Sequence, residues 1–218
     1  MTIKFPNGAV FGISTALSDV IPASAVSNDN PAEATVAGGA VVKDDVLVIE
    51  SNWPLLNNAV SVAGDVVSGA VPLLGLDTTD TTLFPAGKAA ARLFKASGFV
   101  DVDQQGDAST SGGESKEWTG TLLEDPLGRE ISIPIGLTAE KLTLPLYYDP
   151  KKPWYATLKA AAVKRKPVVL RCRLSDGDAI YRYGYLSFNS SPSMNANNPM
   201  QNQMAFTSLG EATLVEAA

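Results

Sequence analysis

Residues 142–211, "LTLPLYYDPKKPWYATLKAAAVKRKPVVLRCRLSDGDAIYRYGYLSFNSSPSMNANNPMQNQMAFTSLGE", decide the fold, because signals for a strand, a helix and a hairpin follow one another there. The first signal is an extended apolar run over residues 142–148, closed by Asp149-Pro150. Proline lacks an N–H and has a fixed φ, so it stops a strand ladder. The run therefore predicts a strand that ends at this proline.

A helix is predicted over residues 153–165. Alanine, the strongest helix former, recurs through this segment, and proline stands in the first turn, where its missing N–H costs no bond. Pro167 ends the helix. The residues spaced for one buried stripe are Trp154, Leu158, Ala161 and Ala162.

The next segment predicts a hairpin and a closing strand. Over residues 168–175, Val168, Leu170, Cys172 and Leu174 alternate with Val169, Arg171 and Arg173, the period of two typical of a half-buried strand. Asp176-Gly177 is a hairpin turn signal, and a tyrosine-rich partner strand follows over residues 179–188. Gly184 in the middle of that strand indicates a bulge or a close backbone approach. A last strand is expected at residues 204–209.

This order resembles the C-terminal half of the major tail tube proteins of long-tailed, siphovirus-type bacteriophages. The matching residues are "PWYATLKAAAVKRKPVVLRCRLSDGDAIYRYGYLSFNSS" at 153–191 and "NQMAFTSLGE" at 202–211. In that family a helix precedes a hairpin with a D-G or N-G turn, and the second strand carries a glycine followed by a small polar residue, here Gly184 and Ser187. The resemblance covers residues 117–215 well and the first hundred residues loosely. The alternative is any α+β domain with one helix on a sheet.

The resemblance implies a mainly β fold: a β-sandwich of two antiparallel sheets with one packed α-helix, as a single tail tube domain over residues 1–218. It implies stacked rings, commonly of six subunits, that form the tube through which DNA is ejected. Proteins of this family have a long loop or hairpin that reaches the next ring, and we assign residues 52–87 to it.

The resemblance also implies the partners: further copies of the chain, the tape measure protein, tail tip and terminator proteins, and double-stranded DNA passing through the lumen without specific binding. The expected location is the virion tail, after assembly in the host cytoplasm. No signal peptide and no apolar run of about 18 residues is found, so no membrane partner is predicted. Two alternatives stay open: another ring-forming virion protein, such as a tail terminator or head-tail connector, and a carbohydrate-binding β-sandwich.

Charge is distributed unevenly along the chain. Residues 1–125 hold 6 Lys and Arg against 16 Asp and Glu, whereas residues 126–218 hold 11 against 7. Such separation permits self-association through opposed potentials. An acidic lumen would repel DNA phosphates, and the acids that we expect there are Asp44, Asp45, Glu50 and Asp65. The basic residues that we expect at a contact between subunits are Lys151, Lys152, Lys159, Lys164 and Lys166.

Enzyme chemistry is not predicted. The chain has no histidine and a single cysteine, Cys172, which we expect to be a buried, inert thiol. The stretch that begins with Asp101 and Asp103 matches the start of a calcium loop but has Gly112 at its twelfth position, and Asp77 with Asp80 is expected to be a solvated loop. We therefore predict no catalytic residue, no cofactor and no metal site.

Three tyrosines, Tyr181, Tyr183 and Tyr185, fall on one face of their strand, near Arg171, Arg173 and Arg182. They could stack on nucleic-acid bases. We favour a packing role or a contact between subunits.

The remaining elements are assigned more coarsely. Residues 46–50 and 60–67 predict one hairpin. Residues 118–123 and 131–137, joined by Asp125-Pro126-Leu127-Gly128, predict another. We also expect a short hairpin around residues 6–8, a loop or extended arm over 14–39, a strand over 94–102 and a loop over 103–116.

Overall fold

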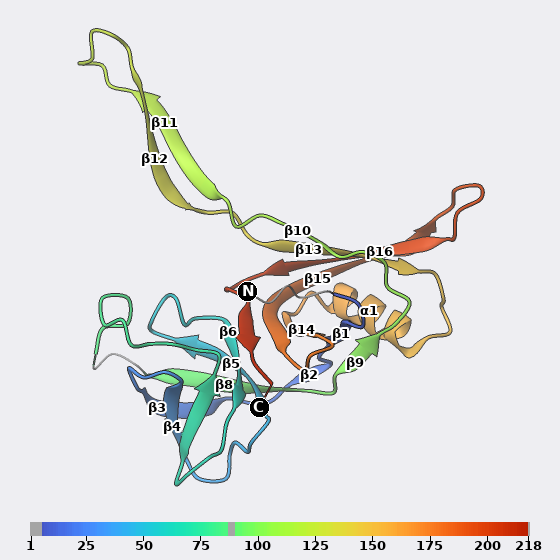
Figure 1. Ribbon diagram of the computed structural model, residues 1–218, viewed down its shortest axis with the longest axis horizontal. Coiled ribbons are helices and arrows are strands. Elements are labelled where there is room, and N and C mark those ends of the chain that lie inside the picture. The colour runs from blue at the N-terminus through green and yellow to red at the C-terminus, as the bar shows by residue number, and fades with distance from the viewer. Residues whose placement is uncertain (1–5, 87–89, 218) are drawn as a thin grey trace.

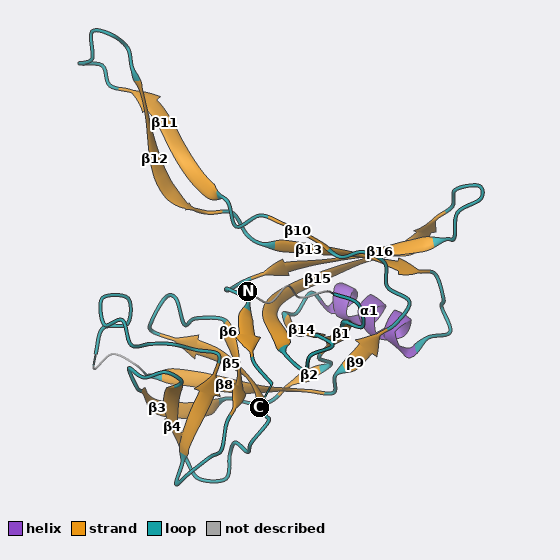
Figure 2. Ribbon diagram, viewed as in Figure 1, coloured by secondary structure: helices purple, strands orange, loops and turns teal. Residues whose placement is uncertain are grey.

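The computed structural model describes residues 6–86 and 90–217. Within them the fold is mainly β, with two larger antiparallel sheets, one α-helix and a separate two-stranded hairpin (Figures 1 and 2). The predicted class, mainly β with antiparallel sheets and one packed helix, is confirmed.

The first sheet has eight strands and curves around the helix (Figure 1). Its order is β10-β13-β16-β15-β14-β1-β9, and β17 pairs with β15. The strands are β1 (Val10–Ile13), β9 (Val100–Val102), β10 (Ser109–Ser111), β13 (Lys141–Tyr147), β14 (Val168–Arg173), β15 (Ala179–Ser193), β16 (Gln201–Ser208) and β17 (Thr213–Val215). The strand, hairpin and closing strand predicted from residues 142–211 are therefore present.

The helix α1 (Pro153–Lys164) packs on the concave face of this sheet. Trp154 and Leu158 are buried as the stripe predicts, and the helix ends at Arg165, whose φ of 50° is left-handed. The Trp154 indole N–H donates to Asp103, and the Lys152 ammonium lies 2.6 Å from the same carboxylate. The hydrogen bond from Lys152, and then the one from Trp154, hold the pKa of Asp103 below its usual value. The start of the helix is thereby tied to the end of β9.

The second sheet closes into a barrel, which the sequence did not predict. Its strands are β2 (Ala16–Leu17), β3 (Ile21–Val26), β4 (Ala32–Val36), β5 (Val46–Ser51), β6 (Ala59–Ala63), β7 (Ala70–Leu74) and β8 (Ala91–Ser97). The order β8-β3-β4-β7-β6-β5 returns to β8, because β5 and β8 pair over six residues, from Val46↔Ala96 to Ser51↔Ala91. Closure removes the open edges of a flat sheet. Leu47, Ile49 and Leu93 are fully buried in the barrel core.

The barrel packs against the convex face of the first sheet. Val46, Val48 and Val60 point outward from the barrel and form one cluster with Tyr181 and Tyr183 of β15. The strand β5 is thus buried on both faces, which explains its continuous apolar run. Two of the three predicted tyrosines are packing residues within the chain.

The structure corrects several expectations for the N-terminal half. Residues 14–39, expected as a loop or arm, contain β2, β3 and β4, and the expected strand over 94–102 is divided between β8 in the barrel and β9 in the first sheet. The strand β1 pairs with β14 and β9. Its expected hairpin partner in residues 3–5 lies outside the described residues. The expected loop 103–116 contains β10 and the start of β11.

Residues 52–87 also differ from the expected projecting loop. They supply β6 and β7 to the barrel, and Trp53 packs edge-on against Phe84 at a centroid distance of 5.4 Å, so that both rings belong to the barrel core. The hairpin of β11 (Ser115–Thr121) and β12 (Glu130–Leu137) projects instead and extends away from both sheets (Figure 1).

Candidate assembly surfaces

The projecting hairpin has one apolar and one polar face. The pairs Trp118↔Ile133 and Gly120↔Ile131 place these side chains on one face, and Ile135 continues the row. The indole of Trp118 lies over Gly120, where an added Cβ would come within 2.5 Å of the ring. The polar residues of the opposite face are Glu117, Thr119, Thr121, Glu130 and Ser132. The hairpin is therefore amphipathic.

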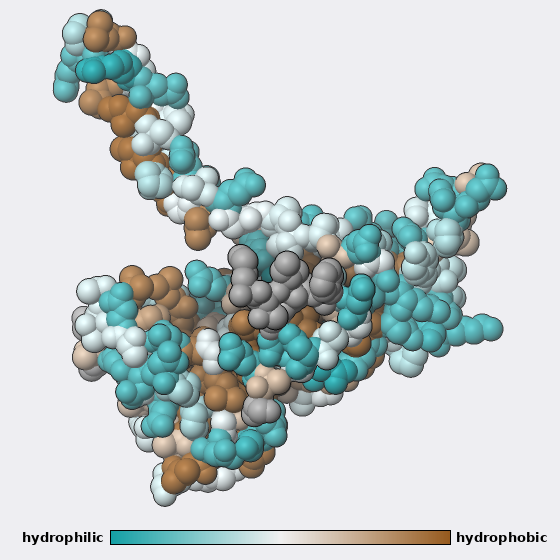
Figure 3. Space-filling model, in the orientation of Figure 1, coloured by the Kyte–Doolittle hydropathy of each residue, from teal (hydrophilic) through white to brown (hydrophobic). Residues whose placement is uncertain are grey.

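Nothing in the described chain covers the apolar face. Every residue of β12 is exposed, and Trp118 on β11 is 49% exposed. The space-filling view shows apolar surface running along the arm (Figure 3). A two-stranded hairpin is marginally stable alone in water and needs a further layer against its apolar face. An uncovered row of this length marks an interaction surface.

The tip of the hairpin is more exposed still. Leu123 and Leu127 are 104% and 76% exposed. The turn itself is ordered by Asp125, whose carboxylate accepts the Leu127 N–H at 3.0 Å and pairs with Arg129 at 2.8 Å. The Arg129 guanidinium holds the pKa of Asp125 below its usual value. A well-defined turn thus presents two leucines to solvent.

The convex face of the first sheet is bare wherever the barrel does not cover it. Registered neighbours form rows across the sheet, such as Ser109, Thr143, Ala205 and Ser187. On the strands β10, β13, β16 and β15, the other residues of this face are Ser111, Lys141, Pro145, Tyr147, Tyr185, Asn189, Gln201, Gln203 and Thr207. Of these, Lys141 alone carries a charge. Over these four strands the face is polar and almost uncharged, with none of the acids that we expected to line a lumen. The ion pairs of Asp101 with Arg171 and Arg173 lie on the same side of the sheet at β9 and β14.

The predicted lumen acids lie on the barrel, and three of the four pair with cations of the same chain. The nitrogen–oxygen distances are 2.6 Å for Lys95 and Asp45, 2.6 Å for Arg92 and Glu50, and 2.8 Å for Lys43 and Asp65. Asp44 is exposed with a φ of 67°. Ion pairing with these cations weakens the field that the three paired carboxylates would present to DNA.

The predicted basic residues lie on and beside α1. Four of them, Lys151, Lys159, Lys164 and Lys166, are exposed, while Lys152 is held by Asp103. Residues 159–166 contain four cations and no acid. The helix therefore ends in a positively charged surface.

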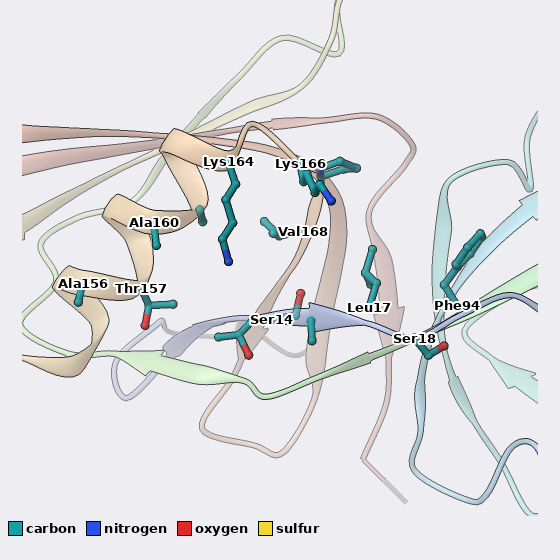
Figure 4. Close-up of a pocket in the computed structure, with 14 residues that line it drawn as sticks. Ser14, Leu17, Ser18, Phe94, Ala156, Thr157, Ala160, Lys164, Lys166 and Val168 are labelled. Atoms are coloured by element: carbon teal, nitrogen blue, oxygen red, sulfur yellow. The ribbon is translucent and has the colours of Figure 1, made fainter.

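A groove runs between this end of α1 and the barrel (Figure 4). Its volume is about 830 Å³, and its lining is mostly apolar, with Ala156 and Ala160 from the helix facing Leu17 and Phe94 from the barrel. Lys164 extends from the helix into the groove, and Lys166 lies at its end (Figure 4). The sequence could not reveal this groove, because its two walls are about 60 residues or more apart in the chain.

The other residues considered from the sequence have local partners. Asp101 pairs with Arg171 and Arg173, at 3.1 and 2.5 Å, so both candidate calcium ligands, Asp101 and Asp103, contact cations. Within residues 6–86 and 90–217, no three carboxylate or thiol side chains gather as metal ligands. Asp77 and Asp80 accept bonds within their own Thr/Asp loop, which lowers the pKa of each.

Cys172 is buried as predicted, and burial raises the pKa of its thiol. Tyr185, unlike the other two tyrosines of β15, is 47% exposed. No helix in the described part of the chain has the length and hydrophobicity that crossing a bilayer requires.

An uncovered amphipathic hairpin and a bare sheet face are typical of structural proteins that associate through β surfaces. The chain belongs to the phage tail tube protein (TTP) family, whose model matches residues 51–217. The matched range contains α1, the projecting hairpin and every strand from β6 to β17. A search of curated proteins found no matching relative. The protein is therefore a structural component of the phage virion tail.

Proposed function

We propose that copies of this chain assemble into stacked rings of six, which form the tail tube and conduct DNA into the host during ejection. The observation that carries this proposal is the bare, nearly uncharged face of β10, β13, β16 and β15. Strands lie about 4.8 Å apart, so with ordinary tilt roughly two dozen are needed to enclose a DNA duplex. Four strands from each of six subunits supply that number.

The bare face suits the wall of a DNA conduit. A basic wall would hold phosphates through counterion release, whereas an uncharged polar wall neither binds nor repels them strongly. With Lys141 as its one charge, the face contributes a single cation for each subunit. We therefore place this face, and not the paired acids of the barrel, at the lumen.

The position of the subunit in the proposed tube determines its partners. Each subunit contacts further copies within and between rings, and the lumen holds the tape measure protein before DNA passes. The tail tip and terminator proteins meet the two ends of the tube. Assembly takes place in the host cytoplasm and completes a tail of the siphovirus type.

The test is negative-stain electron microscopy of the purified chain over a concentration series. Rings or tubes with a central hole are expected, and long tubes separate this function from that of a terminator or connector, which forms single rings. A chain that stays monomeric at high concentration, even with an added tail tip complex, would contradict the proposal.

The lumen assignment has a test of its own. Thr143→Cys and Ser187→Cys place thiols on the bare face, where a bulky maleimide should react in the free subunit and be excluded after assembly. Gly38→Cys, which lies in a turn of the barrel with open space around it, is the control for a position away from the lumen. Equal labelling of all three positions in tubes would place the bare face elsewhere.

A further inference from the structure

The hairpin and the groove are complementary, although they belong to distant parts of the molecule. The hairpin tip presents Leu123 and Leu127 to solvent, and the groove offers an apolar floor between α1 and the barrel. The hairpin projects away from α1, so it cannot fold back onto the groove of its own chain (Figure 1). A second copy can supply the missing half of each surface.

The charges of the hairpin and of the groove are also complementary. Residues 114–137, which include the hairpin, carry five acids and two bases, whereas residues 159–166 at the groove carry four cations. Glu124 stands between the two exposed leucines of the tip. Lys164 and Lys166 line the groove that those leucines would enter (Figure 4). Opposite potentials steer such surfaces together and fix the orientation of the contact.

We propose that the tip of the β11–β12 hairpin of one copy docks in the groove between α1 and the barrel of a second copy. Leu123 and Leu127 cover the apolar floor near Ala160, and Glu124 pairs with Lys164 and Lys166. This inference rests on the proposed self-assembly and names the surfaces that carry it. The basic end of α1 is then a contact between subunits, and the hairpin, not residues 52–87, is the arm that reaches the neighbour.

The contact has the symmetry that a tube needs. Each copy has one hairpin and one groove, and the two surfaces differ, so the contact is heterologous. Docking leaves the hairpin of the second copy free to reach a third. Such contacts close into rings or continue as helical assemblies, depending on the rotation that each step introduces.

Disulfide trapping tests the contact directly. Protein with Leu123→Cys is mixed with protein carrying Ala160→Cys, and a mild oxidant is added before and after assembly. We expect the two to form mixed disulfide dimers at least tenfold more than a matched pair of Thr119→Cys and Ala160→Cys, because Thr119 lies on the polar face below the tip. Native Cys172 is buried and should not interfere.

A charge exchange tests the role of the two lysines. Glu124→Lys should raise the protein concentration needed for assembly about tenfold, because an attraction becomes a repulsion. Lys164→Glu with Lys166→Glu in the same chain should restore assembly to within about threefold of the wild type. Thermal unfolding of the unassembled variants shows whether each subunit is folded.

The outcomes separate the two proposals. Tubes without the disulfide, and with no effect of Glu124→Lys, would overturn the docking and leave the tube function standing. If the wild type forms neither rings nor tubes, the proposed function fails, and the disulfide then decides the docking alone. Equal trapping of the matched pair would also overturn it.

Discussion

Replacing Gly184 by alanine should destabilise the subunit more than any other glycine-to-alanine change in its sheets. A Cβ at this position would lie 2.0 Å from the Thr207 carbonyl oxygen of β16, with Ser208 Cα at 3.0 Å. The strands must separate by at least 1.0 Å to bring the first contact to 3.0 Å. A shift of that size breaks about two ladder hydrogen bonds, each contributing about 1 kcal/mol. Overpacking adds roughly 1–3 kcal/mol.

The expected loss of about 3 kcal/mol corresponds to a fall in Tm of about 10 °C for a chain of this size. Thermal and urea unfolding of the unassembled subunit, followed by circular dichroism, measures it. Gly38→Ala is the matched control, since open space surrounds Gly38, and we expect a change within about 0.5 kcal/mol. If Gly184→Ala and Gly38→Ala both unfold at the Tm of the wild type, the strands β15 and β16 accommodate the added Cβ without loss of stability, and the prediction is wrong.

Two further substitutions and one thiol reaction test groups that the fold buries or pairs. Asp103→Asn should cost about 1 kcal/mol at neutral pH, a small value because the carboxylate is half exposed and water screens its ion pair with Lys152. Since the folded pKa of Asp103 is depressed, the difference from the wild type should begin to shrink as pH falls below about 4 and vanish only below the folded pKa, as urea unfolding at a series of pH values would measure. Glu140→Gln should cost about 2 kcal/mol by urea unfolding, because it removes the counter-charge of the Arg182 guanidinium, 2.9 Å away and 12% exposed. The Cys172 thiol should react with an aromatic disulfide about a hundredfold more slowly in the folded chain than in urea, and equal rates would contradict its burial.

The C-terminal half could be predicted from the sequence because its signals are local. The helix is set by its alanines and by the prolines at either end, and the β14–β15 hairpin by Asp176-Gly177. Even the close approach at Gly184 follows from one glycine inside a strand pattern. Each of these features depends on residues within a few positions of one another.

The barrel could not be predicted because its signals are weak and its closure is distant. The strand β4 alternates Ala32, Ala34 and Val36 toward the core, and alanine is a poor strand former. Closure depends on the pairing of β5 with β8, whose residues lie about 40 to 50 positions apart. Strands made of small residues, in a sheet that closes through one distant pairing, give no local strand signal. Residues 14–39 were therefore expected to be a loop or an extended arm.

The candidate assembly surface was half predicted. The hairpin of residues 118–123 and 131–137 was predicted correctly. Its isoleucines Ile131, Ile133 and Ile135 alternate with other residues, but alternation indicates only that a face is covered. It does not say which chain supplies the cover. Assigning the reaching arm to residues 52–87 followed from the family resemblance, which implies a long loop or hairpin in this half of the chain, but the barrel buries the apolar residues of this segment.

The open sheet has edges that are poor sites for uncontrolled pairing. The strands β9 and β10 at its two ends contain three residues each, and β10 is Ser-Thr-Ser. Short polar edges offer few hydrogen bonds and little apolar surface, so they discourage random association of free subunits. Specific recognition between subunits must then come from side chains, and the β11–β12 hairpin exposes far more side chains than the short edge strands do. In the assembly that we propose, docking of the hairpin sets the neighbours in place first, and the short edges pair only when they are already held side by side.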